Sequence, residues 1–430
     1  MNPSPQKSRI FYGWYILVGC FFLLFFQSGA RHSFGVMFKP MIAQLGWDRA
    51  SISLAFFLNM TLFAITLTVA GRFYDRYGPR WVIFISAIFM AAGYISMSRI
   101  ESLWEFYLYY GIIAAIGVGG ASVPLVAAVM SKWFEKRRGL TISLALTGNC
   151  IGQFVLVPLF TEFVLHWDWR ASYLLIGFII LVVNTILAFG VIKGDPQDFG
   201  LQPQVYPGLQ NRDQADTDHP GENDTGADLG LREALGTYSF WLFLAMMFIC
   251  GSGDFLVSAH IIPMVTDYDF SPQTAGYMLA GFGLMSMGGI LIAGPVSDLI
   301  GNKIPIAITF ILRIGLFVMI LKYQNLVSFY VFALLFGFTF LITAPLTATL
   351  AGKMYGFTHV GLLSGFITTI HHFGGGFWAY MGGLLFDRTG SYRLIFILSA
   401  ILASIALVCT VFIKEERHEQ TIPEGANSNY

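Results

Sequence analysis

Several ionisable side chains lie inside apolar stretches of this 430-residue chain, where they could bind a charged ligand or a proton. They fall in three segments, LLFFQSGARHSFGVMF, CGSGDFLVSAHIIP and TTIHHFGGGF, and are Arg31, His32, Asp254, His260, His371 and His372. A guanidinium can hold a carboxylate through paired N–H donors, whereas a carboxylate or an imidazole can take up and release a proton. Anion binding linked to proton transfer is therefore the chemistry that these residue types favour.

The elements that carry these residues are predicted to be membrane-spanning helices. The chain is 56% hydrophobic and 12% charged, with a mean hydropathy of +0.66, whereas a soluble domain has about 25% charged residues. Apolar segments of about 20 residues are long enough to cross a bilayer as helices, and no alternating strand pattern of a barrel is present. We predict an all-α membrane protein with twelve transmembrane helices, near residues 11–38, 50–70, 81–99, 104–131, 139–165, 171–192, 238–263, 273–293, 303–321, 327–351, 360–385 and 392–413.

Composition also argues against other classes of protein. A formal net charge of zero gives no reason to expect a nucleic-acid partner, and the four cysteines lack the paired spacing of a zinc site or a disulfide framework. No nucleophile–base motif or phosphate-binding loop indicates an enzyme, so we expect no catalytic residues, no metal and no cofactor. Lys7 and Arg9 precede the first span without a small-residue cleavage site, which predicts a retained first helix.

The chain divides into two similar halves. Residues 193–230 are polar, acidic and rich in Gly and Pro, and are typical of a flexible linker between a bundle at 1–192 and a bundle at 231–430. An offset of 223 residues relates GRFYDRYGPR, which starts at Gly71, to GPVSDLIGNK, which starts at Gly294. Two six-helix bundles built on one plan are therefore expected.

Loop charge predicts the orientation of the spans. With the N-terminus inside, the inner loops contain most of the loop Lys and Arg residues, as in "EKRRG" after the fourth span. Both termini are then cytoplasmic, and we expect a multi-pass protein of the cell inner membrane.

Several motifs resemble those of known carriers. GRFYDRYGPR resembles the cytoplasmic signature of the major facilitator superfamily, and it returns in weakened form in the second half. WFEKRRGLTISLALTGNCIGQ, FYGWYI, DPQDFGLQP and FDRTGSY resemble segments of the monocarboxylate carriers and their bacterial relatives. The resemblance implies the major facilitator fold, with a substrate site between the halves. It also implies proton symport of a small monocarboxylate, of the lactate or pyruvate type, by alternating access in a monomer within the lipid bilayer.

The same resemblance implies a latch at the cytoplasmic face. An aspartate there can accept hydrogen bonds from helix amides and pair with arginine. The expected latch residues are Gly71, Asp75, Arg76, Gly78, Arg80 and Asp298. The alternative is that the basic residues of this loop only orient it.

The repeat suggests a role for Arg31. The 223-residue offset carries Arg31 onto Asp254, so symmetry-related positions of spans 1 and 7 hold opposite charges. We expect these two side chains to pair, with a substrate carboxylate competing for Arg31 and with Asp254 taking the proton. The alternative is that Arg31 extends to the outer surface and leaves the membrane interior.

The motifs also depart from the family pattern. The monocarboxylate carriers have a span 1 lysine at the position that His32 occupies relative to Lys39, and the Asp-Arg pair of their span 8 is absent. Arg31 is the best replacement for the missing cation. Asn149 and His371 align at an offset of 222 and are expected at the cavity wall.

Three further histidines and an arginine have open roles. Adjacent helical residues point about 100° apart, so at most one of His371 and His372 should face the cavity, and either could instead be structural. His260 lies nearer the outer end, where it could gate or titrate. For Arg313, a packing role or a polar neighbour is favoured over substrate binding.

Two other functions remain open at this point. An organic-anion antiporter of the oxalate–formate kind needs two cations in the cavity. The cations that the oxalate–formate exchangers have in spans 8 and 11 are absent from this sequence. A transporter-like membrane sensor normally has an attached signalling domain, which neither the linker nor the tails resemble.

Overall fold

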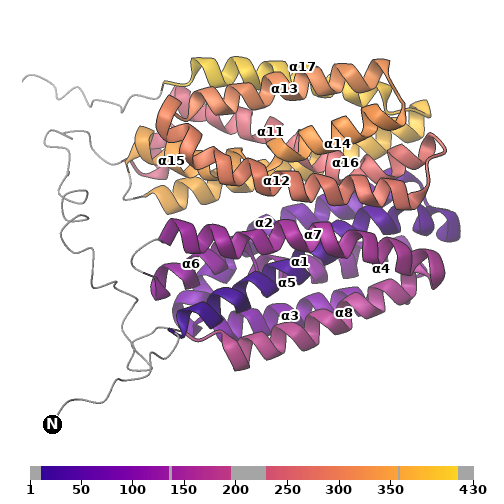
Figure 1. Ribbon diagram of the computed structural model, residues 1–430, viewed down its shortest axis with the longest axis horizontal. Coiled ribbons are helices and arrows are strands. Elements are labelled where there is room, and N and C mark those ends of the chain that lie inside the picture. The colour runs from indigo at the N-terminus through magenta and orange to yellow at the C-terminus, as the bar shows by residue number, and fades with distance from the viewer. Residues whose placement is uncertain (1–10, 135–137, 195–228, 357–358, 415–430) are drawn as a thin grey trace, which may run out of the picture.

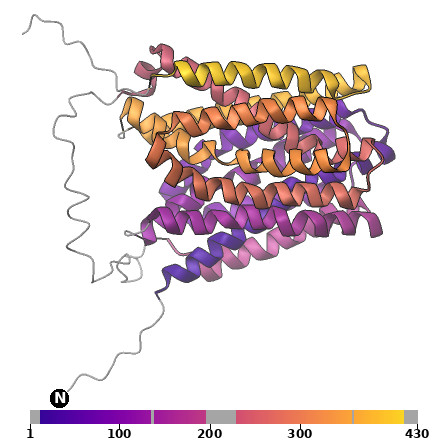
Figure 2. The same ribbon diagram turned by 45° about the horizontal axis from the view of Figure 1, so that its top comes forward.

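The computed structural model describes residues 11–134, 138–194, 229–356 and 359–414, and all of the regular structure in these ranges is helical. The helices run roughly along one axis and form two bundles, with the N-terminal half below and the C-terminal half above (Figures 1 and 2). The expected all-α fold with two repeated halves is thereby confirmed. Most of the linker expected at 193–230 lies outside the described residues, as do both termini.

Six spans make up the N-terminal half, and two of them consist of more than one helical segment. The fourth span comprises α4, the π-helix η1, α5 and α6, and Ala121 and Ser122 interrupt it between α5 and α6. The elements are α1 Gly13–Leu45, α2 Arg49–Tyr77, α3 Pro79–Met97, α4 Leu103–Phe106, η1 Tyr107–Ala114, α5 Ala115–Gly120, α6 Val123–Trp133, α7 Arg138–His166, α8 Trp169–Ile186 and η2 Leu187–Val191.

The C-terminal half repeats this plan. Its fourth span is again interrupted, here between α14 and α15. The elements are α10 Leu231–Ala234, α11 Tyr238–Asp267, α12 Pro272–Ile300, α13 Lys303–Lys322, α14 Leu326–Phe340, α15 Thr343–Tyr355, α16 Val360–Thr389 and α17 Arg393–Phe412.

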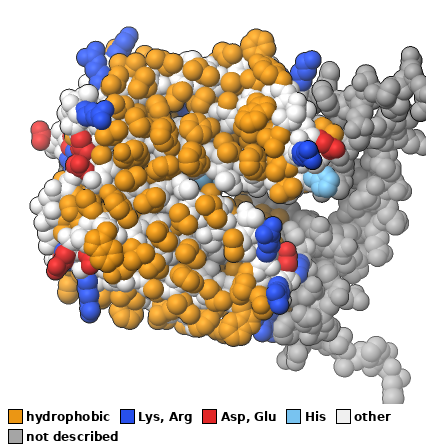
Figure 3. Space-filling view, turned by 180° about the vertical axis from the view of Figure 1, so that it is seen from behind, with side chains coloured by type: hydrophobic (Ala, Val, Ile, Leu, Met, Phe, Trp, Pro, Cys, Tyr) orange, Lys and Arg blue, Asp and Glu red, His pale blue; other side chains and the backbone are white. Residues whose placement is uncertain are grey.

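Within the described residues, eleven spans are both long and apolar enough to cross a membrane. The twelfth expected span is α16, which is 30 residues long but contains two histidines and a series of glycines that lower its hydropathy. In Figure 3, hydrophobic side chains cover the flank of the molecule, whereas charged side chains gather at its two ends. A flank of this kind matches the hydrocarbon core of a bilayer.

Equivalent turns connect the second and third spans of each half. Gly78 follows α2 with a φ of 77°, and Gly301 follows α12 with a φ of 80°. Both donate their backbone N–H to the helix that they end, to Tyr74 and Ser297 respectively. Residues with side chains rarely adopt this left-handed conformation, which explains why the repeat keeps glycine at both positions.

The first helix is longer than expected. The sequence predicts its end near residue 38, but α1 continues through Pro40 to Leu45 and stops at Gly46, whose φ is 69°. Asp48 then caps α2 by accepting a hydrogen bond from the Ser51 N–H at 2.7 Å. The last turn of α1 and the first turn of α2 therefore both lie at the end of the bundle opposite to the start of α1.

We call the end where α1 begins and α17 ends the terminal end, and the opposite end the distal end. The two halves lie closer together at the distal end than at the terminal end (Figure 1). At Gly383 of α16, an added Cβ would lie 2.6 Å from the Arg49 carbonyl oxygen of α2, whereas at Gly365, nearer the terminal end, it would meet nothing within 4 Å. Along α16, the packing against α2 of the other half is therefore tight toward the distal end and open at Gly365.

Candidate functional site

Arg31 lies between the two halves. The centre of its guanidinium lies 4.6 Å from the ring centroid of Phe63 on α2 and 5.2 Å from that of Phe255 on α11. Its Nη2 donates to the Met60 sulfur at 3.0 Å. Among the residues that the structure describes, no carboxylate pairs with Arg31. Contact with Phe255 of the other half places this side chain in the interface between the halves and not along a path to the outer surface.

His372 lies against the same two rings as Arg31. Its imidazole centroid is 4.9 Å from that of Phe63 and 5.3 Å from that of Phe255. Its Nδ1 lies 2.8 Å from the carbonyl oxygen of Thr368, one turn earlier in α16. We call Arg31, Phe63, Phe255 and His372 the central cluster; it joins α1 and α2 of one half to α11 and α16 of the other.

His371 points in another direction, toward its own half. Its Nε2 lies 3.7 Å from Asp254 Oδ2, and its ring centroid is 5.3 Å from that of His372. The expectation that at most one of the two histidines faces the space between the halves agrees with this arrangement, because only His372 contacts the N-terminal half.

Asp254 pairs with Arg313 and not with Arg31. Its Oδ1 lies 2.6 Å from Arg313 Nη2, and both side chains are almost completely buried. The expectation of an Arg31–Asp254 pair is therefore corrected. Repeat symmetry relates positions in the two halves, but it does not determine side-chain direction, and the long side chain of Arg313 reaches Asp254 within one half.

The surroundings of Arg313 satisfy its other donors. Nε donates to Thr339 Oγ1 at 3.0 Å, Nη2 to the Thr339 carbonyl at 3.1 Å, and Nη1 to the Cys250 carbonyl at 3.3 Å. Cys250 Sγ also lies 3.5 Å from Asp254 Oδ2. The expectation of a polar neighbour for Arg313 is confirmed. Cys250, Asp254 and His371 could in principle hold a metal ion, but the adjacent guanidinium repels a cation.

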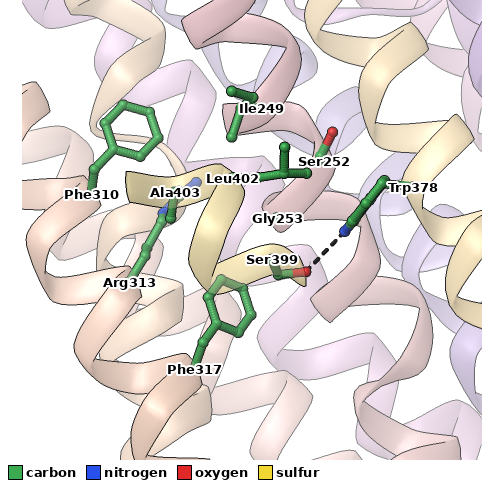
Figure 4. Close-up of a pocket in the computed structure, with 10 residues that line it drawn as sticks. All are labelled: Ile249, Ser252, Gly253, Phe310, Arg313, Phe317, Trp378, Ser399, Leu402 and Ala403. Carbon is green, nitrogen blue, oxygen red and sulfur yellow. Dashed lines mark hydrogen bonds between the residues drawn. The ribbon is translucent and has the colours of Figure 1, made fainter. Parts of the chain in front are cut away.

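A small cavity adjoins Arg313 inside the C-terminal half (Figure 4). It lies between α11, α13, α16 and α17, and the Trp378 indole N–H donates to Ser399 Oγ at 2.9 Å in its wall. The cavity has room for about one water molecule. It is too small for an organic acid, and it does not lie between the halves.

His32 and Asn149 are half-buried on α1 and α7. His32 Nδ1 lies 2.9 Å from the carbonyl oxygen of Ser28, so one ring nitrogen of His32 is engaged by its own helix. Asn149 makes no side-chain hydrogen bond to any described residue. His32 is the chain neighbour of Arg31 and lies within reach of its charge, whereas no recorded interaction joins Asn149 to the central cluster.

His260 belongs to a separate polar region at the distal end. Its Nδ1 lies 2.9 Å from the Tyr392 hydroxyl, and its Nε2 lies 2.8 Å from the Ala379 carbonyl oxygen. The Arg49 guanidinium donates to the same Tyr392 hydroxyl at 2.8 Å. This chain of hydrogen bonds runs from α2 of one half to α11 and α16 of the other.

Ion pairs join the halves at the same end. Arg49 binds both carboxylate oxygens of Asp267 at 2.8 Å, and Lys39 Nζ lies 2.6 Å from the same carboxylate. Asp387 of α16 accepts from the backbone N–H groups of Arg49 and Ala50 at 3.2 and 2.6 Å. Negative charge at the start of a helix is stabilising. We call Lys39, Arg49, Asp267, Asp387 and Tyr392 the distal lock.

Sequence reasoning missed the distal lock. FDRTGSY contains Asp387 and Tyr392, but the lock residues do not follow the 223-residue repeat. The available signal was positional: Lys39 and Arg49 flank the turn between the first two spans, and Asp267 and Asp387 lie at the ends of spans 7 and 11. Opposite charges at corresponding membrane depth in the two halves could have indicated the contact.

The expected latch lies at the other end of the bundle. Asp75 and Arg76 are exposed, and no ion pair joins either of them to another described residue. Arg80 Nε donates to the Ile192 carbonyl at 3.2 Å within its own half. Gly71 has open space around it. The side chain of Asp298, like Lys136 and Arg137, lies outside the described residues.

Comparisons with known proteins agree with this architecture. The model of the Major Facilitator Superfamily matches residues 20–256 and 242–428. The chain is 26% identical to the uncharacterized MFS-type transporter YcxA of Bacillus subtilis, with 98% of this chain and 99% of the relative covered. It is 23% identical to monocarboxylate transporter 13 of Bos taurus (93% and 89% covered) and 24% identical to the oxalate:formate antiporter of Oxalobacter formigenes (96% and 94%).

Solved structures share the fold at low sequence identity. The nucleoside transporter NupG superposes with a TM-score of 0.72 and 13% identity over 93% of this chain and 99% of NupG.

Proposed function

Because the chain belongs to the Major Facilitator Superfamily, we propose that it is a secondary transporter that moves a small monocarboxylate together with a proton by alternating access. The observation that supports this proposal most directly is the unpaired guanidinium of Arg31 between the two halves. A cation inside a membrane is costly unless it is neutralised, so it marks a functional site. A substrate carboxylate would supply the missing negative charge.

The geometry around Arg31 favours an anion that arrives at the edge of the guanidinium. The rings of Phe63 and Phe255 lie near it, and among the described residues only the Met60 sulfur accepts a hydrogen bond from it. A thioether is a weak acceptor, so the remaining N–H donors are available for bidentate binding of a carboxylate. Phe63 and Phe255 come from different halves, so a substrate bound to Arg31 would contact both halves of the protein.

The two ends of the bundle support alternating access. The distal lock and the packing of Gly383 against Arg49 hold the halves together at one end. The latch residues Asp75 and Arg76 are exposed at the other end. We propose that the terminal end faces the cytoplasm, that this conformation is open inward, and that the distal lock opens while the latch forms when the carrier turns outward.

The location of the carrier and the roles of the other candidate residues follow from the same proposal. The carrier would reside in the cell inner membrane as a monomer with both termini cytoplasmic. A titratable side chain of α16 beside Arg31 would take up the proton, because Asp254 is held by Arg313 at 2.6 Å. His32, Asn149 and His260 would line or gate the path.

Anion exchange of the oxalate–formate type is the second candidate. It is favoured by the similarity to the oxalate:formate antiporter and by the presence of two interior arginines, Arg31 and Arg313. Against it, the charge of Arg313 is already neutralised by Asp254 at 2.6 Å, which leaves one unpaired cation.

Uptake by the purified, full-length protein in liposomes tests the proposal. Radiolabelled lactate, pyruvate and oxalate would be supplied outside in turn, with and without an inward pH gradient. Symport predicts that the gradient drives accumulation of a monocarboxylate. Oxalate uptake that needs internal formate and ignores the gradient would establish the exchanger instead.

A further inference from the structure

We infer that the Nε2 atom of His372 binds the co-transported proton, and that it does so cooperatively with an anion on Arg31. This inference rests on the proposed function, since it names the proton-binding group of that site. It follows from the position of His372, from the hydrogen bond of its other nitrogen and from the charges around it.

His372 and Arg31 lie around the same pair of aromatic rings. Arg31 of α1 and His372 of α16 contact the same two rings, Phe63 and Phe255, at centroid distances of 4.6 to 5.3 Å. Two groups that can each be positively charged are thereby held around one pair of phenylalanines at the interface of the halves. Each must respond to the charge of the other.

The hydrogen bond of Nδ1 determines which nitrogen is free. The Thr368 carbonyl oxygen, 2.8 Å away, can only accept, so Nδ1 carries a hydrogen. In the neutral ring Nε2 then has the lone pair, and it makes no hydrogen bond to any described residue. His372 is therefore a proton acceptor whose accepting atom is unoccupied.

The charges around His372 link its proton to the anion. Arg31 faces it from α1, His371 adjoins it on α16, and beyond His371 lie Asp254 of α11 and Arg313 of α13. Asp254 and Arg313 neutralise each other, so Arg31 is the permanent net charge that opposes a proton on His372, beside the titratable His371. A carboxylate bound to Arg31 removes that opposition, and by linkage the proton strengthens anion binding to the same extent.

The charge of the whole site supports the coupling. Before binding, the site has one positive charge, on Arg31. When a carboxylate binds Arg31 and a proton from water forms a bond to Nε2, the site again has one net positive charge. Loading with both ions therefore adds no charge to the membrane interior, whereas loading with either ion alone changes it.

The other acidic and basic groups are less suited to this role. Protonation of Asp254 would leave the buried Arg313 without its counter-ion, which is unfavourable. Asp254, a fixed group 3.7 Å away, acts on His371 more strongly than Arg31 does, so the proton of His371 depends less on a bound anion. His371 also contacts Phe255, at 5.7 Å between ring centroids, but among these residues only His372 contacts both rings that lie beside Arg31.

A first experiment needs no substrate. The full-length protein in detergent, labelled with ¹⁵N-histidine, would be titrated by NMR, with His372→Gln used to assign the signal of His372. In Arg31→Gln, the pH at the midpoint of the His372 titration should rise by about one unit or more, which corresponds to at least a tenfold gain in proton affinity. Arg31→Lys keeps the charge and should leave the midpoint near that of the wild type, as should the exposed control Arg99→Gln. Equal midpoints in Arg31→Gln and wild type would overturn the inference.

A second experiment adds a probe anion. Sodium pyruvate would be mixed with weakly buffered protein, and proton uptake would be followed with a pH dye alongside direct binding of labelled pyruvate. Wild type should take up protons as pyruvate binds, and His372→Gln should bind pyruvate without that uptake while His371→Gln retains it. Undiminished proton uptake by His372→Gln would overturn the inference but leave the transport proposal standing. Absence of pyruvate binding would count against the proposed substrate class, and the NMR titration would still decide the link between Arg31 and His372.

Discussion

Arg49 and Asp267 join the two halves of the protein through a bidentate ion pair, in which both N–H···O distances are 2.8 Å. Lys39 binds the same carboxylate from α1. Asp267 therefore receives two cations from the N-terminal half while it belongs to the C-terminal half. Its removal should loosen the distal end more than any other single change in the lock.

Replacement of Asp267 by Asn should shift the carrier toward distal opening. The variant loses the negative charge between Lys39 and Arg49, which then repel each other. Ser53, which is buried near His260 at the distal end, reports the opening when it is replaced by Cys in a background without the native cysteines. A membrane-impermeant maleimide should label that cysteine several-fold faster in Asp267→Asn.

The matched control for this labelling is Asp269→Asn, because Asp269 is exposed two residues away and makes no described ion pair. Equal labelling of the Asp267 and Asp269 variants would show that the ion pairs do not hold the distal end shut.

Asp254→Asn should destabilise the folded protein. The change leaves the buried Arg313 without its counter-ion, and breaking a buried pair from one side costs about 3–5 kcal/mol. Thermal unfolding in detergent should show a lower Tm for Asp254→Asn and for Arg313→Met alone. The double variant Asp254→Leu, Arg313→Met should recover part of the loss, because no unpaired charge remains. A double variant less stable than either single one would contradict this account of the pair.

Gly383→Ala should impair closure of the distal end. The added Cβ would lie 2.6 Å from the Arg49 carbonyl oxygen and from Ser53 Oγ, so α16 must move away from α2. We expect strongly reduced uptake with normal amounts of protein in the membrane. Gly365→Ala lies on the same helix in open space and should transport normally. Equal activity of the two variants would show that the close packing of α2 and α16 is not required.

Phe63→Leu should weaken anion binding, whereas Phe63→Tyr should largely preserve it. Leucine removes the ring next to the Arg31 guanidinium, and such a contact contributes about 0.5–2 kcal/mol. Direct binding of labelled pyruvate should show a several-fold higher Kd for the leucine variant. If the two variants bind alike, the ring does not help to position Arg31.

The fold could be predicted from the sequence almost completely, because apolar length determines the spans and the repeat around Gly78 and Gly301 determines the two halves. The ends of the helices could be predicted less well. The prediction ended the first span near residue 38, but α1 continues past Pro40 and stops only at Gly46, which adopts the left-handed conformation that ends the helix. The repeat placed Arg31 and Asp254 at matching positions, but it could not show that Asp254 points to Arg313. The distal lock depends on contacts between residues at or near the ends of five helices from both halves of the chain, and no local pattern encodes them.

The most direct test of the central claim is anion-dependent acidification of liposomes that contain the full-length protein and a pH-sensitive dye. Lactate and pyruvate would be added outside, and protein-free liposomes would give the passive leak of acid. The account predicts acidification above the leak in the wild type and in the exposed control Arg99→Gln, and its loss in Arg31→Gln. Acidification that persists at the wild-type rate in Arg31→Gln would contradict the claim that Arg31 binds the transported carboxylate.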